Sequence, residues 1–137
     1  MASLRAPGAR LTADMAQGYL FLIIALVFNA TANILMKLAS RRVPPMEGLS
    51  LVDKALALAT NYHLVLGLVL FASNILFYVL ALKRINLSVA YPIMSSGGFL
   101  IISVFSVYYL RETLTAVQIG GIVLIAAGIA MVAYNLS

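Results

Sequence analysis

Four long stretches of this chain contain no charged residue. All nine Lys and Arg residues and all four Asp and Glu residues lie outside them. The stretches are 22 to 28 residues long and run from Met15 to Met36, Ala55 to Leu82, Ile85 to Leu110 and Thr113 to Ser137. A helix needs about 20 mostly apolar residues to cross the hydrocarbon core of a bilayer. The pattern therefore predicts four crossings.

The crossings are expected to be α-helices. Lipid offers no water to backbone amides, so only helices and closed barrels span it, and these stretches lack the short alternating pattern of a barrel. With 137 residues, 64% of them hydrophobic, the chain leaves no length for a separate catalytic domain. We predict an all-α fold with a flexible tail over residues 1–17 and one four-helix transmembrane domain over residues 18–137.

The composition excludes several kinds of chemistry. The chain has no cysteine and one histidine, so thiolate sites and cysteine nucleophiles are absent. We expect no enzyme activity, no metal and no cofactor. A net charge of +5 would suggest nucleic acid as the partner of a soluble protein. Here the basic residues flank predicted spans, where anionic headgroups explain them more simply, so we expect the bilayer and not nucleic acid as the partner.

The spans are expected at about residues 18–38, 62–82, 87–110 and 116–136. Pro44 and Pro45 follow the first of them, as expected after a helix end. Before the second span, Ser50 and Asp53 resemble a capping box in front of apolar residues at helical spacing. A short helix lying on the membrane surface and an N-terminal extension of the second span explain this segment equally well.

Charges near the span ends do not fix the orientation of the chain. Lys and Arg normally concentrate on the cytoplasmic side. With four spans, one side holds Arg5, Arg10, Lys83 and Arg84, and the other holds Lys37, Arg41, Arg42, Lys54 and Arg111. The difference is too small to decide. We expect that the chain inserts both ways or relies on a partner, and that two copies could pack antiparallel.

The polar residues inside the spans are amides and hydroxyls. Asn29 lies about 12 Å from Lys37 along a helix, near the bilayer centre, and Asn33 is one turn further on the same face. Buried amides need partners, so they either contact a substrate headgroup or hydrogen-bond neighbouring helices. The candidate substrate-binding residues are Asn29, Asn33, Asn74, Tyr91, Ser95 and Ser96.

Three further groups of residues have candidate roles. Pro92 removes a helix hydrogen-bond donor and Gly97 and Gly98 remove side-chain bulk, so the third span should flex or pack closely there. Gly121 and Gly128 are seven residues apart and lie on nearly one helix face, which favours dimerisation. The basic residues expected to attract an anionic headgroup are Arg41, Arg42 and Lys54.

No carboxylate lies within a predicted span. Proton-coupled export of cations usually needs an intramembrane carboxylate that alternates between proton and substrate. The four acidic residues are all terminal or in loops: Asp14, Glu47, Asp53 and Glu112. The chain therefore offers no such group.

Several short motifs lie between Ser88 and Val132. They are Ala90-Tyr91-Pro92-Ile93-Met94-Ser95, Glu112-Thr113-Leu114 and the segment from Gly121 to Gly128, and Asn33 to Lys37 adds a fourth motif in the first span. With these motifs the chain resembles the drug/metabolite transporter superfamily. Its four-helix members include the small multidrug resistance proteins and the subunits that flip aminoarabinose-linked undecaprenyl phosphate.

The resemblance implies a dimer and a class of substrate. Asn29 stands where the multidrug exporters carry their membrane glutamate, and Met94 stands where they carry a substrate-stacking tryptophan, while Tyr91 is retained. The Ala-Tyr-Pro motif and the long first loop are closer to the lipid-flippase subunits and to EamA-type domains. Members of the superfamily work as antiparallel pairs or as duplicated chains, so one such repeat would have to pair to enclose a path.

The preferred hypothesis is a multi-pass transporter subunit of the inner membrane. It would work as a dimer, with a second copy or a different subunit, and move an amphipathic substrate, lipid-linked or not. Two alternatives stay open. One is proton-coupled efflux of cationic drugs, and the other is a non-transporting membrane subunit that stabilises a partner.

Overall fold

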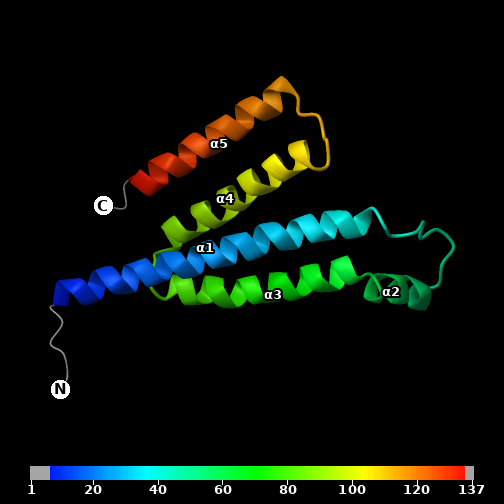
Figure 1. Cartoon of the computed structure of the whole chain (residues 1–137), viewed down its shortest axis with the longest axis horizontal. Helices are drawn as coiled ribbons and strands as arrows, with labels where there is room; N and C mark the ends of the chain where they lie inside the picture. Colours follow the sequence, from blue (N-terminus) through cyan, green and yellow to red (C-terminus); the bar gives the residue numbers. More distant parts are fainter. Residues whose placement is uncertain (1–6, 135–137) are drawn as a thin grey trace, which may run out of the picture.

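The computed structural model describes residues 7–134, and this range contains five α-helices and no strand. The helices are α1 (Pro7–Ser40), α2 (Leu51–Ala59), α3 (Tyr62–Leu82), α4 (Leu87–Tyr108) and α5 (Ala116–Tyr134). In Figure 1, α1 lies between α3 and α4, and α5 lies beyond α4. Of the described helices, only α4 contacts α5. The predicted all-α fold is confirmed.

Three helical segments are long and apolar enough to cross a membrane. They are Ala13–Ser40, Tyr62–Leu82 and Leu87–Tyr108. The apolar part of α5, Ala116–Val132, is shorter. Three of the four predicted spans are thus confirmed as helices of sufficient length, while the fourth crossing stays a prediction.

The helix boundaries differ from the expected ones at two places. Helix α1 begins at Pro7 and not near Gly18, so residues 7–17 are helical where a flexible tail was expected, and residues 1–6 lie outside the described range. Proline suits the first turn because its missing N–H would lack a helical partner there anyway. Helix α4 ends at Tyr108, and Arg111 after it adopts a positive φ of 55°.

The segment between the first two spans forms a separate helix, α2. The Ser50 hydroxyl accepts a hydrogen bond from the Asp53 N–H at 3.2 Å, so the predicted N-cap is confirmed. The backbone of Asn61 is extended, and its side chain accepts from the Leu64 N–H at 3.4 Å as the N-cap of α3. Because of this break, α2 is not an extension of α3. Its location on a membrane surface stays a prediction.

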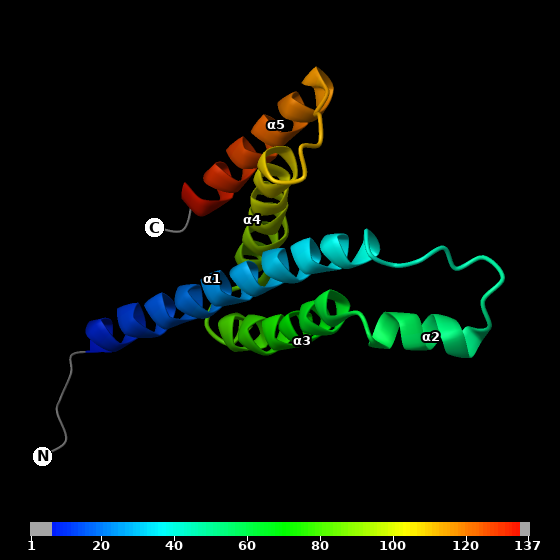
Figure 2. The same ribbon diagram turned by 45° about the vertical axis from the view of Figure 1, so that its right-hand side comes forward.

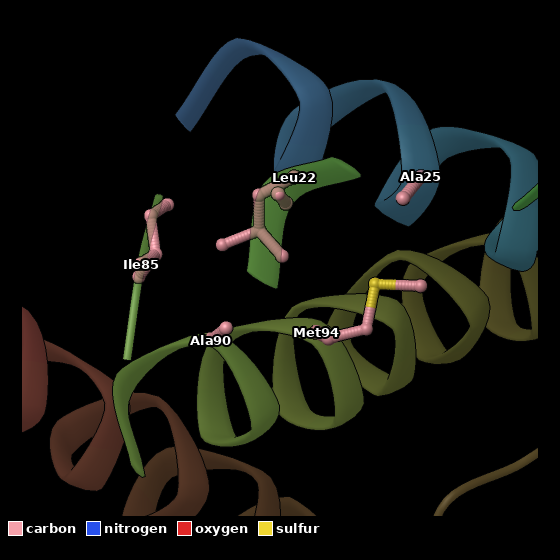
Figure 3. Packing of buried hydrophobic residues seen from close by; sticks show 6 residues of the cluster. Leu22, Ala25, Ile85, Ala90 and Met94 are labelled. Atoms are coloured by element: carbon pink, nitrogen blue, oxygen red, sulfur yellow. The ribbon is translucent and has the colours of Figure 1, made fainter. Parts of the chain in front are cut away.

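Small residues form most of the interior. The buried apolar residues are Leu22, Ala25, Ala30, Ala32, Ala39, Ala81, Ile85, Ala90 and Met94. Figure 3 shows Leu22 and Ala25 of α1 facing Ala90 and Met94 of α4, with Ile85 from the α3–α4 connection beside them. Lipid is as apolar as a leucine side chain, so helices in a membrane associate through close packing at small residues.

Large apolar side chains point outward instead. Leu76 of α3 is 68% exposed, Val104 of α4 is 57% exposed and Val117 of α5 is 85% exposed. Exposed apolar surface of this extent would cause association in water, whereas the hydrocarbon core of a bilayer solvates it. The distribution of side chains therefore agrees with a membrane protein.

Glycines allow both neighbours of α1 to approach it closely. A Cβ atom at Gly67 of α3 would lie 3.2 Å from the backbone oxygen of Ala32 and 3.4 Å from the Leu35 Cβ. At Gly97 of α4, a Cβ would overlap the Leu26 side chain. The α1–α3 contact at Gly67 tolerates an added side chain less well than the contact at Gly97, because it involves the backbone of α1 and not the end of a flexible side chain.

Replacing Gly67 with leucine should therefore separate α3 from α1. We expect Gly67→Leu to lower the free energy of unfolding by about 1–3 kcal/mol, as is typical of overpacking. The measurement is unfolding in a mild-detergent and SDS titration followed by circular dichroism. Gly120→Leu is the matched control, because a Cβ at Gly120 meets no atom within 4 Å. Equal stability of the two variants would contradict the packing described here.

Candidate functional site

Two of the predicted polar residues lie together at the contact between α1 and α4. The Asn33 amide donates a hydrogen bond to the Asn29 backbone oxygen at 2.8 Å and lies 3.5 Å from its side-chain oxygen. The Asn29 amide nitrogen lies against α4, only 3.1 Å from where a Cβ of Gly98 would be. Gly98 thus leaves the space that the Asn29 amide occupies.

Asn74 of α3 is the most deeply buried of the predicted polar residues. It is 6% exposed, and its side-chain oxygen has no hydrogen-bond partner in the described part of the chain. The hydroxyl of Tyr78, one turn further along α3, is likewise buried and without a partner there. Unpaired buried polar atoms cost free energy. A further polar group that hydrogen-bonds the Asn74 oxygen or the Tyr78 hydroxyl would remove this cost.

Tyr91 and Ser95 lie on the outer side of α4. Tyr91 is 62% exposed and lines an open hollow of about 550 Å³ with Leu87, Ser88 and Pro92. The Ser95 hydroxyl donates to the Tyr91 backbone oxygen at 2.9 Å, a common arrangement for serine in membrane helices. Asn29 and Asn74 do not line this hollow, so a common substrate path for them with Tyr91, Ser95 and Ser96 stays a prediction.

The residues predicted for a hinge in α4 and for a dimer contact on α5 differ in how closely they are packed. Helix α4 continues through Pro92, and Gly97 and Gly98 both pack against α1, so close packing accounts for the two glycines. Flexing of α4 stays a prediction. Open space surrounds Gly121 and Gly128 of α5, where a Cβ would meet no atom within 4 Å. Their role in dimerisation also stays a prediction.

The three basic residues predicted to attract a headgroup have different surroundings in the structure, and their role stays a prediction. Arg42 donates to the Tyr62 hydroxyl at 2.8 Å, and its guanidinium lies 3.4 Å from the His63 Nδ1. Lys54 is half-buried on α2. Arg41 instead faces a carboxylate, that of Glu112, in the connection between α4 and α5.

Glu112 belongs to a cleft between the C-terminal ends of α1 and α4. Figures 1 and 2 show α4 leading away from α1 toward this end. The cleft has a volume of about 270 Å³. Its lining consists of Asn33, Ile34 and Lys37 from α1, Ile102, Phe105 and Ser106 from α4, and Leu110 and Glu112 from the connection.

An ion pair closes one side of this cleft. The Lys37 Nζ lies 3.1 Å from the Glu112 Oε1, and the Arg41 Nη2 lies 3.9 Å from the same oxygen. The Glu112 backbone N–H donates to the Ser106 oxygen at 3.1 Å, after the left-handed turn at Arg111. The turn and this bond bring the connection back over the end of α1.

The sequence carries a signal for half of this site. Asn29, Asn33, Lys37 and Arg41 are spaced by four residues, which places them on one face of a helix. The amides and the basic residues were predicted as two separate groups, so the continuous polar face was missed. Ser106 and Glu112 could not be added from spacing, because their position depends on the turn after α4.

The cleft continues into a groove between α4 and α5. The groove has a volume of about 410 Å³ and shares Ile102, Ser106 and Glu112 with the cleft. Its other lining residues are Phe99, Ser103, Leu114, Gln118, Gly121, Ile122 and Ile125. Charged and polar groups thus occupy one end of a hollow whose walls are mainly apolar.

The remaining carboxylates lie away from the centre of the helices. Asp14 is exposed near the other end of α1, beside a hollow that Lys83 and Arg84 also line. Glu47 and Asp53 are exposed in the loop after α1 and on α2. Glu112 is the carboxylate that lines the cleft.

Comparison with protein families places the chain in a membrane family. Residues 21–133 match the family described as "Putative transmembrane family 234". The chain belongs to this family. The match overturns the membership in the drug/metabolite transporter superfamily, and in its small multidrug resistance and EamA-type groups, that the sequence analysis inferred. That inference rested on short motifs, and the Pro-, Ser- and Gly-containing ones among them consist of residues in which packed membrane helices are rich in general.

This transmembrane family 234 protein also resembles a bacterial protein. It is 33% identical over 115 residues to the uncharacterized protein y4nH of Sinorhizobium fredii (strain NBRC 101917 / NGR234). The aligned part covers 80% of this chain and 93% of that protein. No solved structure matches the chain. Membership of this family identifies the chain as a membrane protein. The family description does not name a molecular role.

The ion pair with Lys37 lowers the pKa of the Glu112 carboxyl group. The side-chain hydrogen bond from Lys37 is the largest effect that holds the pKa of Glu112 below its usual value of 4.5. Desolvation opposes it, while the charge of Lys37, a hydrogen bond from Ser106 and the charge of Arg41 reinforce it. Because the pKa is lower in the folded protein, the ionised group stabilises the fold above pH 4.5.

This stabilisation should disappear in acid. We expect wild type to melt at a slightly higher temperature than Glu112→Gln at pH 7, because the pair is partly exposed, and the difference to shrink as the pH falls below 4.5 through the folded-state pKa. Thermal unfolding in detergent across this pH range measures it. Glu47→Gln, which removes an exposed carboxylate elsewhere, should show no such difference. A pH-independent gap between wild type and Glu112→Gln would contradict the ionised pair.

Proposed function

We propose that this protein is a multi-pass subunit of an inner-membrane transporter that moves an amphipathic substrate, lipid-linked or not. The observation that carries the proposal is the amphipathic hollow. Its charged end, at Lys37 and Glu112, suits a polar headgroup, and the groove between α4 and α5 suits an apolar chain. Ligand sites typically combine mainly apolar walls with a few placed polar groups.

The position of α5 supports a moving part in this function. Helix α5 contacts α4 and neither α1 nor α3, so it can shift relative to α4 without disturbing the α1–α3 contact. A single chain with an open groove does not enclose a path across a membrane. A second subunit, another copy or a different protein, would complete it against α5.

The proposed subunit crosses the membrane four times, with α5 as the fourth span. The Ala116–Val132 segment is 17 residues long, which is within the range of about 17–25 residues seen for spans. The natural absence of cysteine allows single cysteines to report topology. Positions 86 and 113 precede α4 and α5 respectively, and a third cysteine can follow Ser137.

Four crossings predict a simple labelling pattern. With a membrane-impermeant maleimide on sealed vesicles, Asn86→Cys and the appended cysteine should label to equal extents, and Thr113→Cys to the complementary extent. If equal numbers of chains insert in each direction, half of the molecules should be labelled at each of the three positions. If the appended cysteine follows Thr113→Cys while Asn86→Cys differs, α5 does not cross, and the four-span arrangement is wrong.

Transport itself can be tested by filling the groove. A leucine at Gly121 meets no atom within 4 Å at its Cβ but lies on the groove wall. In proteoliposomes with a fluorescent short-chain phospholipid in both leaflets, wild type should speed its exchange between leaflets, measured by dithionite quenching. Gly121→Leu should reduce the rate to that of protein-free liposomes.

Gly120→Leu provides the matched control for this assay. It adds the same side chain one residue away, at a position outside the groove lining and with open space around it, so it should exchange lipid like wild type. An equal loss of lipid exchange in Gly121→Leu and Gly120→Leu would show that the groove is not the path of the lipid. A wild-type rate equal to that of protein-free liposomes would favour a non-transporting subunit.

A further inference from the structure

We infer that the cleft binds an anionic headgroup of the phosphate type, and that this group replaces the Glu112 carboxylate at Lys37 and Arg41. The inference rests on the proposed function only in assigning the apolar chain of the ligand to the groove. Glu112 then acts as an internal competitor that occupies the place of the ligand's anionic group.

The charge balance of the cleft favours an anion. Two cations, Lys37 and Arg41, lie within 4 Å of a single carboxylate, so the three groups together carry one positive charge. A cationic headgroup would have to draw Glu112 away from Lys37 and would then lie beside two cations, since Lys37 is in the last turn of α1 and Arg41 directly follows the helix. An anionic headgroup would instead be attracted by both Lys37 and Arg41.

The distances show that Glu112 satisfies the two cations unequally. Its Oε1 is 3.1 Å from the Lys37 nitrogen but 3.9 Å from that of Arg41, and the second distance is beyond hydrogen-bond range. A phosphate group carries more oxygens than a carboxylate and accepts several charge-assisted hydrogen bonds at once. It could therefore bind Lys37 and Arg41 together.

The groups involved are accessible to a ligand. The Lys37 and Arg41 side chains are each 49% exposed and that of Glu112 is 39% exposed. Exposed ion pairs of this kind contribute little to stability, so exchange of one anion for another is energetically feasible. Below the ion pair, Ile34, Ile102 and Phe105 continue the cleft as an apolar wall.

Other basic residues near this end of α1 are less suited to the role. The Arg42 guanidinium is held by the Tyr62 hydroxyl and lies 5.6 Å from the centre of the Tyr62 ring. Lys54 is on α2 and does not line the cleft. The anion site is therefore the i, i+4 pair of Lys37 and Arg41, and not the basic loop as a whole.

The test is a lipid-binding titration by native mass spectrometry of the full chain in mild detergent. The probes are dioleoyl phosphatidic acid and dioleoyl phosphatidylcholine, which share the same chains. The proteins are wild type, Glu112→Gln, Lys37→Gln, Arg41→Gln and the charge-matched control Lys54→Gln, each first checked for helicity by circular dichroism. Millimolar inorganic phosphate is added in a separate arm.

Each variant should change the affinity for phosphatidic acid in a defined direction. Wild type should prefer phosphatidic acid over phosphatidylcholine, and Glu112→Gln should bind phosphatidic acid about 2- to 5-fold more tightly, because the competing carboxylate is gone. Lys37→Gln and Arg41→Gln should weaken binding by a similar factor, and Lys54→Gln should leave it unchanged. Displacement of the lipid by inorganic phosphate would support a site that binds the headgroup alone, and no displacement would support one that needs the lipid.

Two results would overturn the inference. One is weaker binding of phosphatidic acid by Glu112→Gln, which would make the carboxylate a ligand for a cation instead. The other is an equal effect of Lys37→Gln and Lys54→Gln, which would reduce the binding to general surface attraction. Neither result depends on lipid exchange between leaflets, so failure of the transport assay and failure of the anion site are distinguishable. If a variant does not fold, the wild type still provides a test, because equal binding of phosphatidic acid and phosphatidylcholine would contradict an anion site.

Discussion

The close approach of α1 to both of its neighbours is the contact on which the rest of the structure depends. It is possible because Gly67 on α3 and Gly97 and Gly98 on α4 carry no side chain where these helices meet α1. In water, burial of large apolar groups would drive such an assembly, but in lipid the drive comes from packing. Among the described residues, the largest fully buried side chain is accordingly a single leucine, Leu22, while many bulky residues are exposed on the outer surface and others, such as Phe21 and Phe77, are partly buried against the core.

This packing also determines where the site can form. Helices α1 and α4 meet tightly at Gly97 and Gly98 and separate toward their C-terminal ends (Figures 1 and 2). The polar face of α1 runs from the tight region, at Asn29, to the open one, at Lys37. A cleft with a charged end therefore follows from two helices that are in contact at one level and apart at the next. The Lys37–Glu112 pair spans the opening, where both side chains are partly exposed.

The sequence was informative about features that depend on local pattern. The uncharged stretches predicted the helices, and Ser50 with Asp53 predicted the start of α2. It was less informative where distant segments meet. Neither the position of Glu112 against Lys37 nor the role of Gly98 in accommodating Asn29 follows from spacing along the chain, because both depend on the α1–α4 crossing and on the turn at Arg111. The family assignment was wrong because short motifs around Pro92 and the glycines reflect how membrane helices pack.

The state of Glu112 limits how the cleft can open. The hydrogen bond from Lys37 holds the pKa of Glu112 below its ordinary value, so protonation of this carboxyl group would have to work against its pairing with Lys37. A switch driven by a proton is thus disfavoured at this site. Competition from another anion removes the pairing without changing the charge on Glu112. Because Glu112 lies in the connection between α4 and α5, losing its contact with Lys37 would remove one contact between that connection and α1. Occupancy of the cleft would in this way be linked to the position of α5.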